Sequence, residues 1–141
     1  MILEVTESSA TSDVGKALEN LARLRMKGFG LSIDDYGTGY SSMQQLARIA
    51  FTELKIDRSF VSKATKDLTA RVILRSSVKM AKQLNMDSVA EGVETRADFD
   101  LLGRMHCDMA QGYFVAKPMA YADFLSWDRH WTRVGKTDSD A

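Results

Sequence analysis

Several features that would point to other protein classes are scarce or absent in this sequence. It has one cysteine, Cys107, so no disulfide can form within the chain, which fits a protein of the reducing cytosol. It has one proline, Pro118, and no low-complexity tract, which excludes proline-rich linkers. No apolar run approaches the roughly 18–20 residues needed to cross a bilayer, and no stretch reads as a signal peptide. We therefore expect a cytoplasmic bacterial-type protein with no membrane segment.

Neither sign of charge predominates. Lys and Arg together number 19, as do Asp and Glu, so the formal net charge is zero. The basic surface that polymeric nucleic acids require is therefore not indicated, and we expect no nucleic-acid polymer as a partner. Hydrophobic residues make up 45% of the 141 residues, enough for one domain with a buried core.

Strand-like and helix-like segments alternate along the chain. Helix ends are indicated by Gly28 and Asn85, and Thr95 with Asp98 is close to a capping box. This alternation predicts an α/β fold, a parallel sheet with crossover helices. We expect strands at 2–5, 29–35, 51–57, 87–93 and 108–114, helices at 12–27, 42–49, 67–84, 95–104 and 121–131, and a disordered polar tail at 135–141.

Polar residues gather where the predicted strands end, which is where parallel sheets bind their ligands. The Asp34-Asp35 pair is followed by Gly37 and Gly39, which permit a tight turn and close approach to a ligand. An alternative is that the pair only closes a strand as an Asx turn. The regular phasing of polar residues to strand ends favours a site. The candidate residues are Glu4, Asp34, Asp35, Lys55, Glu91, Glu94 and Gln111.

Several carboxylates gathered at one edge of a sheet repel each other unless cations lie among them. Oxygen ligands favour Mg²⁺ or Mn²⁺, and neither His106 nor His130 falls at a strand end, which argues against a histidine-based zinc site. Paired metals suit phosphodiester hydrolysis, in which a lysine such as Lys55 holds water or balances phosphate charge. Enolisation or aldol chemistry could use the same residue types, and spacing alone does not separate these reactions.

Five motifs, in order, resemble those of the EAL domains, the bacterial cyclic di-GMP phosphodiesterases. The resemblance covers nearly the whole chain, residues 1–134, and includes Lys117-Pro118 after the fifth motif. The motifs are Glu4-Val5-Thr6-Glu7, Asp34-Asp35-Tyr36-Gly37-Thr38-Gly39-Tyr40-Ser41-Ser42, Leu54-Lys55-Ile56-Asp57, Glu91-Gly92-Val93-Glu94-Thr95 and Gln111-Gly112-Tyr113.

The resemblance implies the C-terminal part of a TIM-like (β/α) barrel, with about five parallel βα units, that hydrolyses cyclic di-GMP to linear pGpG with two Mg²⁺ or Mn²⁺ ions. Glu4 matches a metal ligand of the family. Asp34 matches the aspartate that bridges two metals, and Asp35 the one that binds the second metal. Lys55 matches the lysine that contacts the hydrolytic water, and Glu91 a catalytic glutamate.

Three further positions and several properties of the whole protein follow from the same resemblance. Glu94 and Gln111 match substrate or second-shell positions, and Glu7 matches the glutamate that anchors the loop at 36–42. That loop is linked in the family to metal binding and dimer-dependent activation. We therefore expect a homodimer, an upstream regulatory domain and a role in bacterial signalling such as biofilm regulation.

The sequence departs from the family mainly by omission. The Glu-Ala-Leu strand, an asparagine ligand of the first metal and an arginine that helps hold the dinucleotide would precede Leu3. We expect the sequence to be part of a longer protein and to hydrolyse cyclic di-GMP poorly or not at all alone. The alternative is a degenerate EAL domain that binds cyclic di-GMP or a protein without hydrolysis. Two of these residues could instead have purely structural roles. Glu7 could cap the following helix, and Lys55 could be a strand-end lysine whose charged end reaches solvent.

Overall fold

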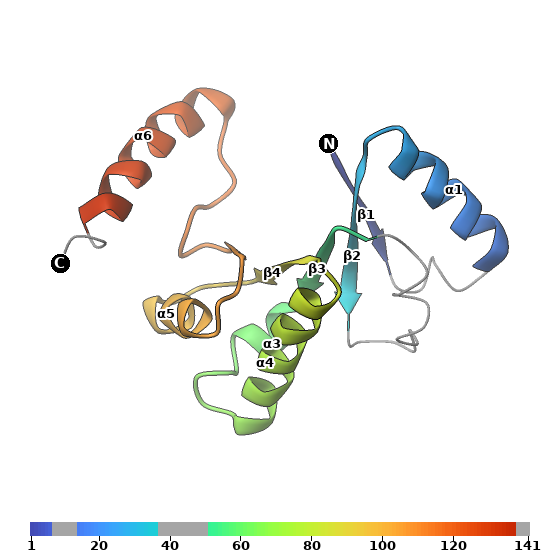
Figure 1. The fold of residues 1–141 in the computed structure, drawn as a ribbon. Coiled ribbons are helices and arrows are strands. Elements are labelled where there is room, and N and C mark those ends of the chain that lie inside the picture. Colours follow the sequence, from blue (N-terminus) through green and yellow to red (C-terminus); the bar gives the residue numbers. More distant parts are fainter. Residues whose placement is uncertain (7–13, 37–50, 138–141) are drawn as a thin grey trace.

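The computed structural model describes residues 1–6, 14–36 and 51–137 (Figure 1). Strands and helices alternate through this part of the chain, as the sequence predicted. The strands are β1 (Ile2–Thr6), β2 (Gly30–Tyr36), β3 (Glu53–Ile56), β4 (Asp87–Glu91) and β5 (Met109–Gln111), and the helices are α1 (Val14–Met26), α3 (Arg58–Val61), α4 (Leu68–Gln83), α5 (Arg96–Arg104) and α6 (Tyr121–Thr137).

The five strands form one parallel sheet in the order β1-β2-β3-β4-β5, which confirms the predicted α/β architecture. Strands β2 to β5 each pair with the strand that precedes them in the sequence. Helix α1 lies between β1 and β2 in the chain, α3 and α4 lie between β3 and β4, and α5 lies between β4 and β5. This sequential order is that of successive βα units in a (β/α) barrel. The carboxyl ends of all five strands therefore lie along the same edge of the sheet.

Local signals in the sequence set the helix boundaries where they were expected. Asp67 caps α4 by accepting a hydrogen bond from the backbone N–H of Thr69, at 2.9 Å. Asn85 follows α4 with a φ of 55°, the left-handed conformation that ends helices. Thr95 and Asp98 form the predicted capping box at the start of α5.

The core lies between the sheet and the helices, in two clusters of buried side chains. Leu31, Ile33 and Leu54 of the sheet belong to the first cluster, with Leu21 of α1. The second cluster joins β3 and β4 to helices α4 and α5. Its buried members are Ile56, Val61, Ala64, Leu74, Val78, Ala90, Val93, Leu101 and Leu102. Each fully buried leucine or isoleucine contributes about 1.5–3 kcal/mol, so these clusters hold the helices on one face of the sheet.

The C-terminal helix contacts this core through aromatic rings. Trp127 and Trp131 stack on one another with ring centroids 5.7 Å apart. Trp131 also lies edge-on to Phe99 of α5, at 6.4 Å. The two tryptophans are therefore packing residues of the C-terminal helix.

Three strands are shorter than predicted, because their flanking residues serve other contacts. The segment after β3 forms the short helix α3, which the sequence did not predict, and Asp57 caps it through the N–H of Ser59. β4 ends at Glu91, since Gly92 takes a φ of 69°. Before β5, the Asp108 carboxylate accepts hydrogen bonds from the backbone N–H and the hydroxyl of Ser88.

Other differences concern the helices. α6 continues through Thr137, beyond the expected end at Trp131, and so includes the first three residues of the expected tail. No proline interrupts it, and its one glycine, Gly135, disfavours a helix by only about 1 kcal/mol. The helix predicted at 42–49 and the end of the tail lie outside the described residues. None of the described helices is long and apolar enough to cross a membrane.

Candidate active site

Lys55 lies at the carboxyl end of β3 with only 6% of its surface exposed. Its neighbours along the strand, Leu54 and Ile56, are buried in the two hydrophobic clusters under the helices. Because side chains alternate along a strand, Lys55 projects from the opposite face of the sheet, the face that lines the interior of a (β/α) barrel. Burial of a lysine on this face requires anionic partners.

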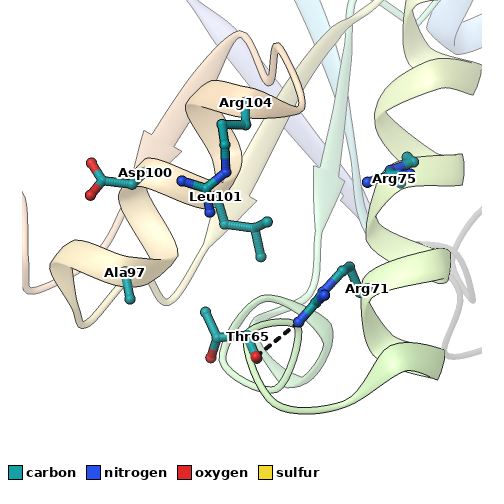
Figure 2. A pocket seen from close by; sticks show the side chains of 7 residues that line it. All are labelled: Thr65, Arg71, Arg75, Ala97, Asp100, Leu101 and Arg104. Carbon is teal, nitrogen blue, oxygen red and sulfur yellow. Dashed lines mark hydrogen bonds between the residues drawn. The ribbon is translucent and has the colours of Figure 1, made fainter.

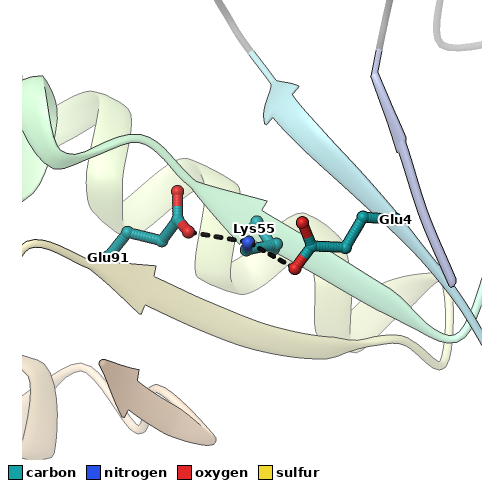
Figure 3. Close-up of polar contacts among 3 residues, drawn as sticks. All are labelled: Glu4, Lys55 and Glu91. Carbon is teal, nitrogen blue, oxygen red and sulfur yellow. Dashed lines mark hydrogen bonds and ion pairs between the residues drawn. The ribbon is translucent and has the colours of Figure 1, made fainter. Parts of the chain in front are cut away.

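Two glutamates supply those partners, and they come from different strands (Figure 3). The Nζ atom of Lys55 lies 2.8 Å from Oε1 of Glu4 on β1 and 2.8 Å from Oε1 of Glu91 on β4. The structure thus brings together three of the residues that the sequence singled out. Glu4 is 58% exposed at its side chain and Glu91 is 22% exposed, so both retain access to solvent or to a ligand.

These contacts decide the charge of Lys55. Burial by itself lowers the pKa of the ammonium group, but the hydrogen bonds to Glu4 and Glu91 and the negative charges of Glu91 and Asp34 raise it further than burial lowers it. The net pKa lies well above the ordinary lysine value. Lys55 is therefore a permanent cation and hydrogen-bond donor at neutral pH, and it cannot act as a general base.

The intervening strand β2 carries a small residue, Ser32, directly beside Glu4. Ser32 of β2 is the register partner of Glu4 on one side and of Glu53 on the other. It is fully buried, and its hydroxyl has no hydrogen-bond partner within the described part of the chain. A small side chain here leaves room for Glu4 to reach across β2 to the third strand, which a large side chain would obstruct.

The Asp34-Asp35 pair lies at an irregularity in strand pairing. Ile33 of β2 pairs with Leu54 of β3, whereas Tyr36 pairs with Ile56, so β2 has one residue more than β3 over this interval. Such a bulge breaks the strict alternation of side chains and is typical of strands next to active sites. The strand predicted at 29–35 ended at Asp35. Instead, pairing continues through Tyr36 with a shifted register.

Two more candidates line a cavity of about 330 Å³ beyond the ends of β4 and β5, next to Glu91. Glu94 follows β4, and Gln111 is the register partner of Glu91 on β5. The cavity extends the polar site toward α3. Its remaining lining residues are Asp57, Arg58, Gly92, Gly112 and Tyr113. Glu7, the loop at 37–42 and the side chain of Asp35 lie outside the described residues.

Two glycines of this site lie in the sequence motifs but were not predicted to have a role of their own. A Cβ on Gly92 would clash with the Cβ of Arg58, and one on Gly112 would clash with the backbone of Val93. The close approach lets the N–H of Val93 donate to the carbonyl of Gln111, at 3.1 Å. A glycine directly after a polar strand-end residue, as in Glu91-Gly92 and Gln111-Gly112, is the signal that could have indicated this contact.

The oxygen donors of the site do not form a closed metal-binding cluster in the part of the chain that the structure describes. Among residues 1–6, 14–36 and 51–137, no three side chains of His, Cys, Asp or Glu form a cluster that could hold a metal. Glu4 and Glu91 are hydrogen-bonded to the Lys55 ammonium instead. In chemical type the oxygen donors fit Mg²⁺ or Mn²⁺, with Asp34 at the same edge of the sheet.

Comparison with known proteins identifies the family. The sequence profile of the EAL domain matches residues 1–118. The chain belongs to the EAL domain family. The match spans all five strands and the site around Lys55, and it confirms the resemblance that the motifs indicated.

Curated relatives and solved structures agree with this assignment. The chain is 43% identical over 126 residues to the bifunctional diguanylate cyclase/cyclic di-GMP phosphodiesterase MucR of Pseudomonas aeruginosa, covering 89% of the chain and 18% of MucR. It is 39% identical over 127 residues to the cyclic di-GMP phosphodiesterase RocR of the same organism, covering 90% of the chain and 32% of RocR. The chain thus spans less than a third of either EAL protein.

Two solved structures that carry ligands have the same fold. The MucR phosphodiesterase in complex with c-di-GMP superposes with a TM-score of 0.82 at 43% identity, covering 87% of the chain and 50% of that structure. BlrP1 of Klebsiella pneumoniae, a manganese/cyclic di-GMP complex, gives a TM-score of 0.73 at 32% identity, covering 79% of the chain and 29% of that structure. The chain therefore spans about half of the MucR domain.

Proposed function

We propose that this chain forms the C-terminal part of an EAL domain that hydrolyses cyclic di-GMP to pGpG. The observation that carries the proposal is the position of Lys55, buried between Glu4 of β1 and Glu91 of β4 on one face of the parallel sheet. Family membership and the phosphodiesterases among the relatives support the reaction class.

In the proposed mechanism, Glu91 accepts a proton from the attacking water, since its carboxylate is close to the site yet accessible. Lys55, held as a cation, donates a hydrogen bond to that water or to a phosphate oxygen and orients it. The water oxygen attacks phosphorus as one P–O ester bond breaks. The ring of the dinucleotide opens, and the leaving oxygen takes up the proton that Glu91 accepted from the water.

Glu4 and Asp34, together with Asp35, would hold Mg²⁺ or Mn²⁺ in this proposal. A bound divalent ion would lower the pKa of water and offset the charge of the phosphate. The manganese/cyclic di-GMP complex of BlrP1, a structural relative, supports this assignment. Glu4 must then exchange its hydrogen bond with Lys55 for a metal contact.

The remaining candidate residues have supporting roles in the proposal. Glu94 and Gln111 contact the substrate or orient its neighbours in the cavity beside Glu91. Glu7 anchors the loop at 36–42. The parent protein acts as a cytoplasmic homodimer controlled by an upstream regulatory domain, and it serves in bacterial signalling.

Because the chain covers half of the MucR phosphodiesterase domain, we assign the activity to a complete domain and expect the 141-residue chain alone to be weak or inactive. An HPLC assay of cyclic di-GMP hydrolysis with Mg²⁺ or Mn²⁺ tests both expectations. It compares the 141-residue chain with a complete EAL domain that has this chain as its C-terminal part. pGpG from the complete domain supports hydrolysis. A complete domain that binds cyclic di-GMP without cleaving it would instead be the degenerate, non-catalytic module. Turnover by the chain alone at ordinary enzymatic rates would overturn the second expectation.

A further inference from the structure

A second cavity lies on the helix side of the sheet, between α4 and α5 (Figure 2). Both helices pack on the second hydrophobic cluster, so this cavity is on the opposite face of the sheet from Lys55. Its volume is about 510 Å³, within the range of small-molecule sites. The lining residues are Thr65, Arg71, Arg75, Ala97, Asp100, Leu101 and Arg104.

Three arginines from two helices surround this cavity. Arg71 is held in place: its Nε donates to the carbonyl of Ala64 at 2.8 Å, and its Nη2 donates to the carbonyl of Thr65 at 2.9 Å. Arg75 lies one turn further along α4, and Arg104 lies near the end of α5. Figure 2 shows Arg71 and Arg75 on one side of the opening and Arg104 on the other.

The positive charge of this cavity is poorly compensated. Within the described part of the chain, no carboxylate forms an ion pair with Arg75 or Arg104. The nearby Asp100 pairs with Arg96, at 2.9 Å, and its carboxylate points away from the opening in Figure 2. Three guanidinium groups around one concave surface with a single diverted carboxylate favour an anion of more than one charge.

Apolar atoms complete the cavity. Leu101, which is 9% exposed, lies below Arg104, and Ala97 lines the wall one turn earlier on α5. The site therefore combines a small apolar surface with converging guanidinium forks. That combination suits a compact organic anion better than an extended acidic segment, which would need a longer groove.

We propose that this cavity, the α4–α5 arginine site, binds a small molecule that carries a phosphate or diphosphate group. A phosphate ester carries about −1.5 to −2 charges at neutral pH, which matches the unpaired arginines. Arginine presents its donors in a planar fork that engages two phosphate oxygens at once. The site is separate from the Lys55 centre, and it does not depend on the hydrolytic activity.

Calorimetric titration of the full chain with inorganic pyrophosphate tests the proposal, with a hexaglutamate peptide as the competing ligand. The double variant Arg75→Gln/Arg104→Gln is expected to bind pyrophosphate at least about tenfold more weakly. The control Lys79→Gln/Arg129→Gln removes the same charge from exposed positions of α4 and α6 that do not line the cavity, and it should bind as the parent does. Arg104→Gln alone serves if the double variant unfolds.

Three results would overturn the proposal. The first is no pyrophosphate binding at millimolar concentration. The second is equal weakening in the control variant, which would indicate non-specific attraction to positive charge. The third is tighter binding of hexaglutamate than of pyrophosphate, which would assign the surface to an acidic protein partner. Glu91→Gln should leave pyrophosphate binding unchanged, so failure of this site and failure of the hydrolytic proposal are distinguishable.

Discussion

The ammonium of Lys55 on β3 contacts Glu4 on β1, 51 residues earlier, by reaching past the strand between them. Beside Glu4, β2 presents the small side chain of Ser32, which leaves room for this contact. A second contact, to Glu91 on β4, completes a charged bridge over four consecutive strands. This bridge organises the candidate active site.

Lys55→Met in the complete domain should reduce hydrolysis of cyclic di-GMP by about 100- to 1000-fold, because it removes the hydrogen-bond donor at the reaction centre. Stability should change little, since methionine fills similar space and both glutamates can be solvated. HPLC turnover and thermal unfolding measure the two effects. Retention of activity would show that Lys55 is only a structural counter-ion.

Glu91→Gln should abolish hydrolysis while leaving the fold intact, because an amide cannot accept the proton of the attacking water. The matched control is Glu19→Gln, at an exposed position of α1 away from the site. Circular dichroism should show the same helix content in both variants. Full activity of Glu91→Gln would remove Glu91 from the mechanism.

Gly92→Ala should destabilise the fold by about 2 kcal/mol or more, since alanine disfavours a positive φ and its Cβ would meet that of Arg58. Gly103→Ala is the opposite case. That glycine lies within α5 with open space around it, so alanine should stabilise by up to about 1 kcal/mol. Urea unfolding of both variants measures the difference, and a neutral Gly92→Ala would contradict the close approach.

Acid unfolding should depend in part on Asp108. The backbone N–H and the hydroxyl of Ser88 donate to its carboxylate and lower its pKa below the ordinary value. A lowered folded-state pKa gives stability that is present above the unfolded pKa, near 3.9, and lost as pH falls through the folded value.

The measurement is the urea midpoint of the parent and of Asp108→Asn between pH 6 and pH 2. Asp108→Asn should be less stable than the parent at pH 6 and should lose less stability on acidification. Identical pH profiles for the two proteins would show that the contacts of Asp108 with Ser88 do not contribute to the pH dependence of stability.

The sequence predicted the fold because its signals are local and repeated. Helix caps such as Thr95-Asp98 and the alternation of apolar segments fix the βα units, and the parallel order follows from their connections. It also predicted which polar residues share one edge, since strand ends of parallel strands meet there. The prediction that Glu4, Lys55 and Glu91 belong to one site rests on this argument alone.

Other features depend on tertiary contacts that no local pattern encodes. The register shift at Asp34-Asp35 arises from how β2 meets β3, and the φ of Gly92 arises from the approach of Arg58. The α4–α5 arginine site likewise joins Arg75 to Arg104, which are 29 residues apart and become neighbours only when the two helices pack. Helix α3 was missed because its four residues are too few for a periodic pattern.

The sequential strand order has a consequence for assembly of the chain. Each of β2 to β5 pairs with a strand that has already been synthesised, so the sheet can lengthen by one βα unit at a time with short loops to close. The Lys55–Glu4 contact is different, because it closes a 51-residue loop and requires three strands to be in register. Its formation therefore marks the moment at which β1, β2 and β3 are all in place.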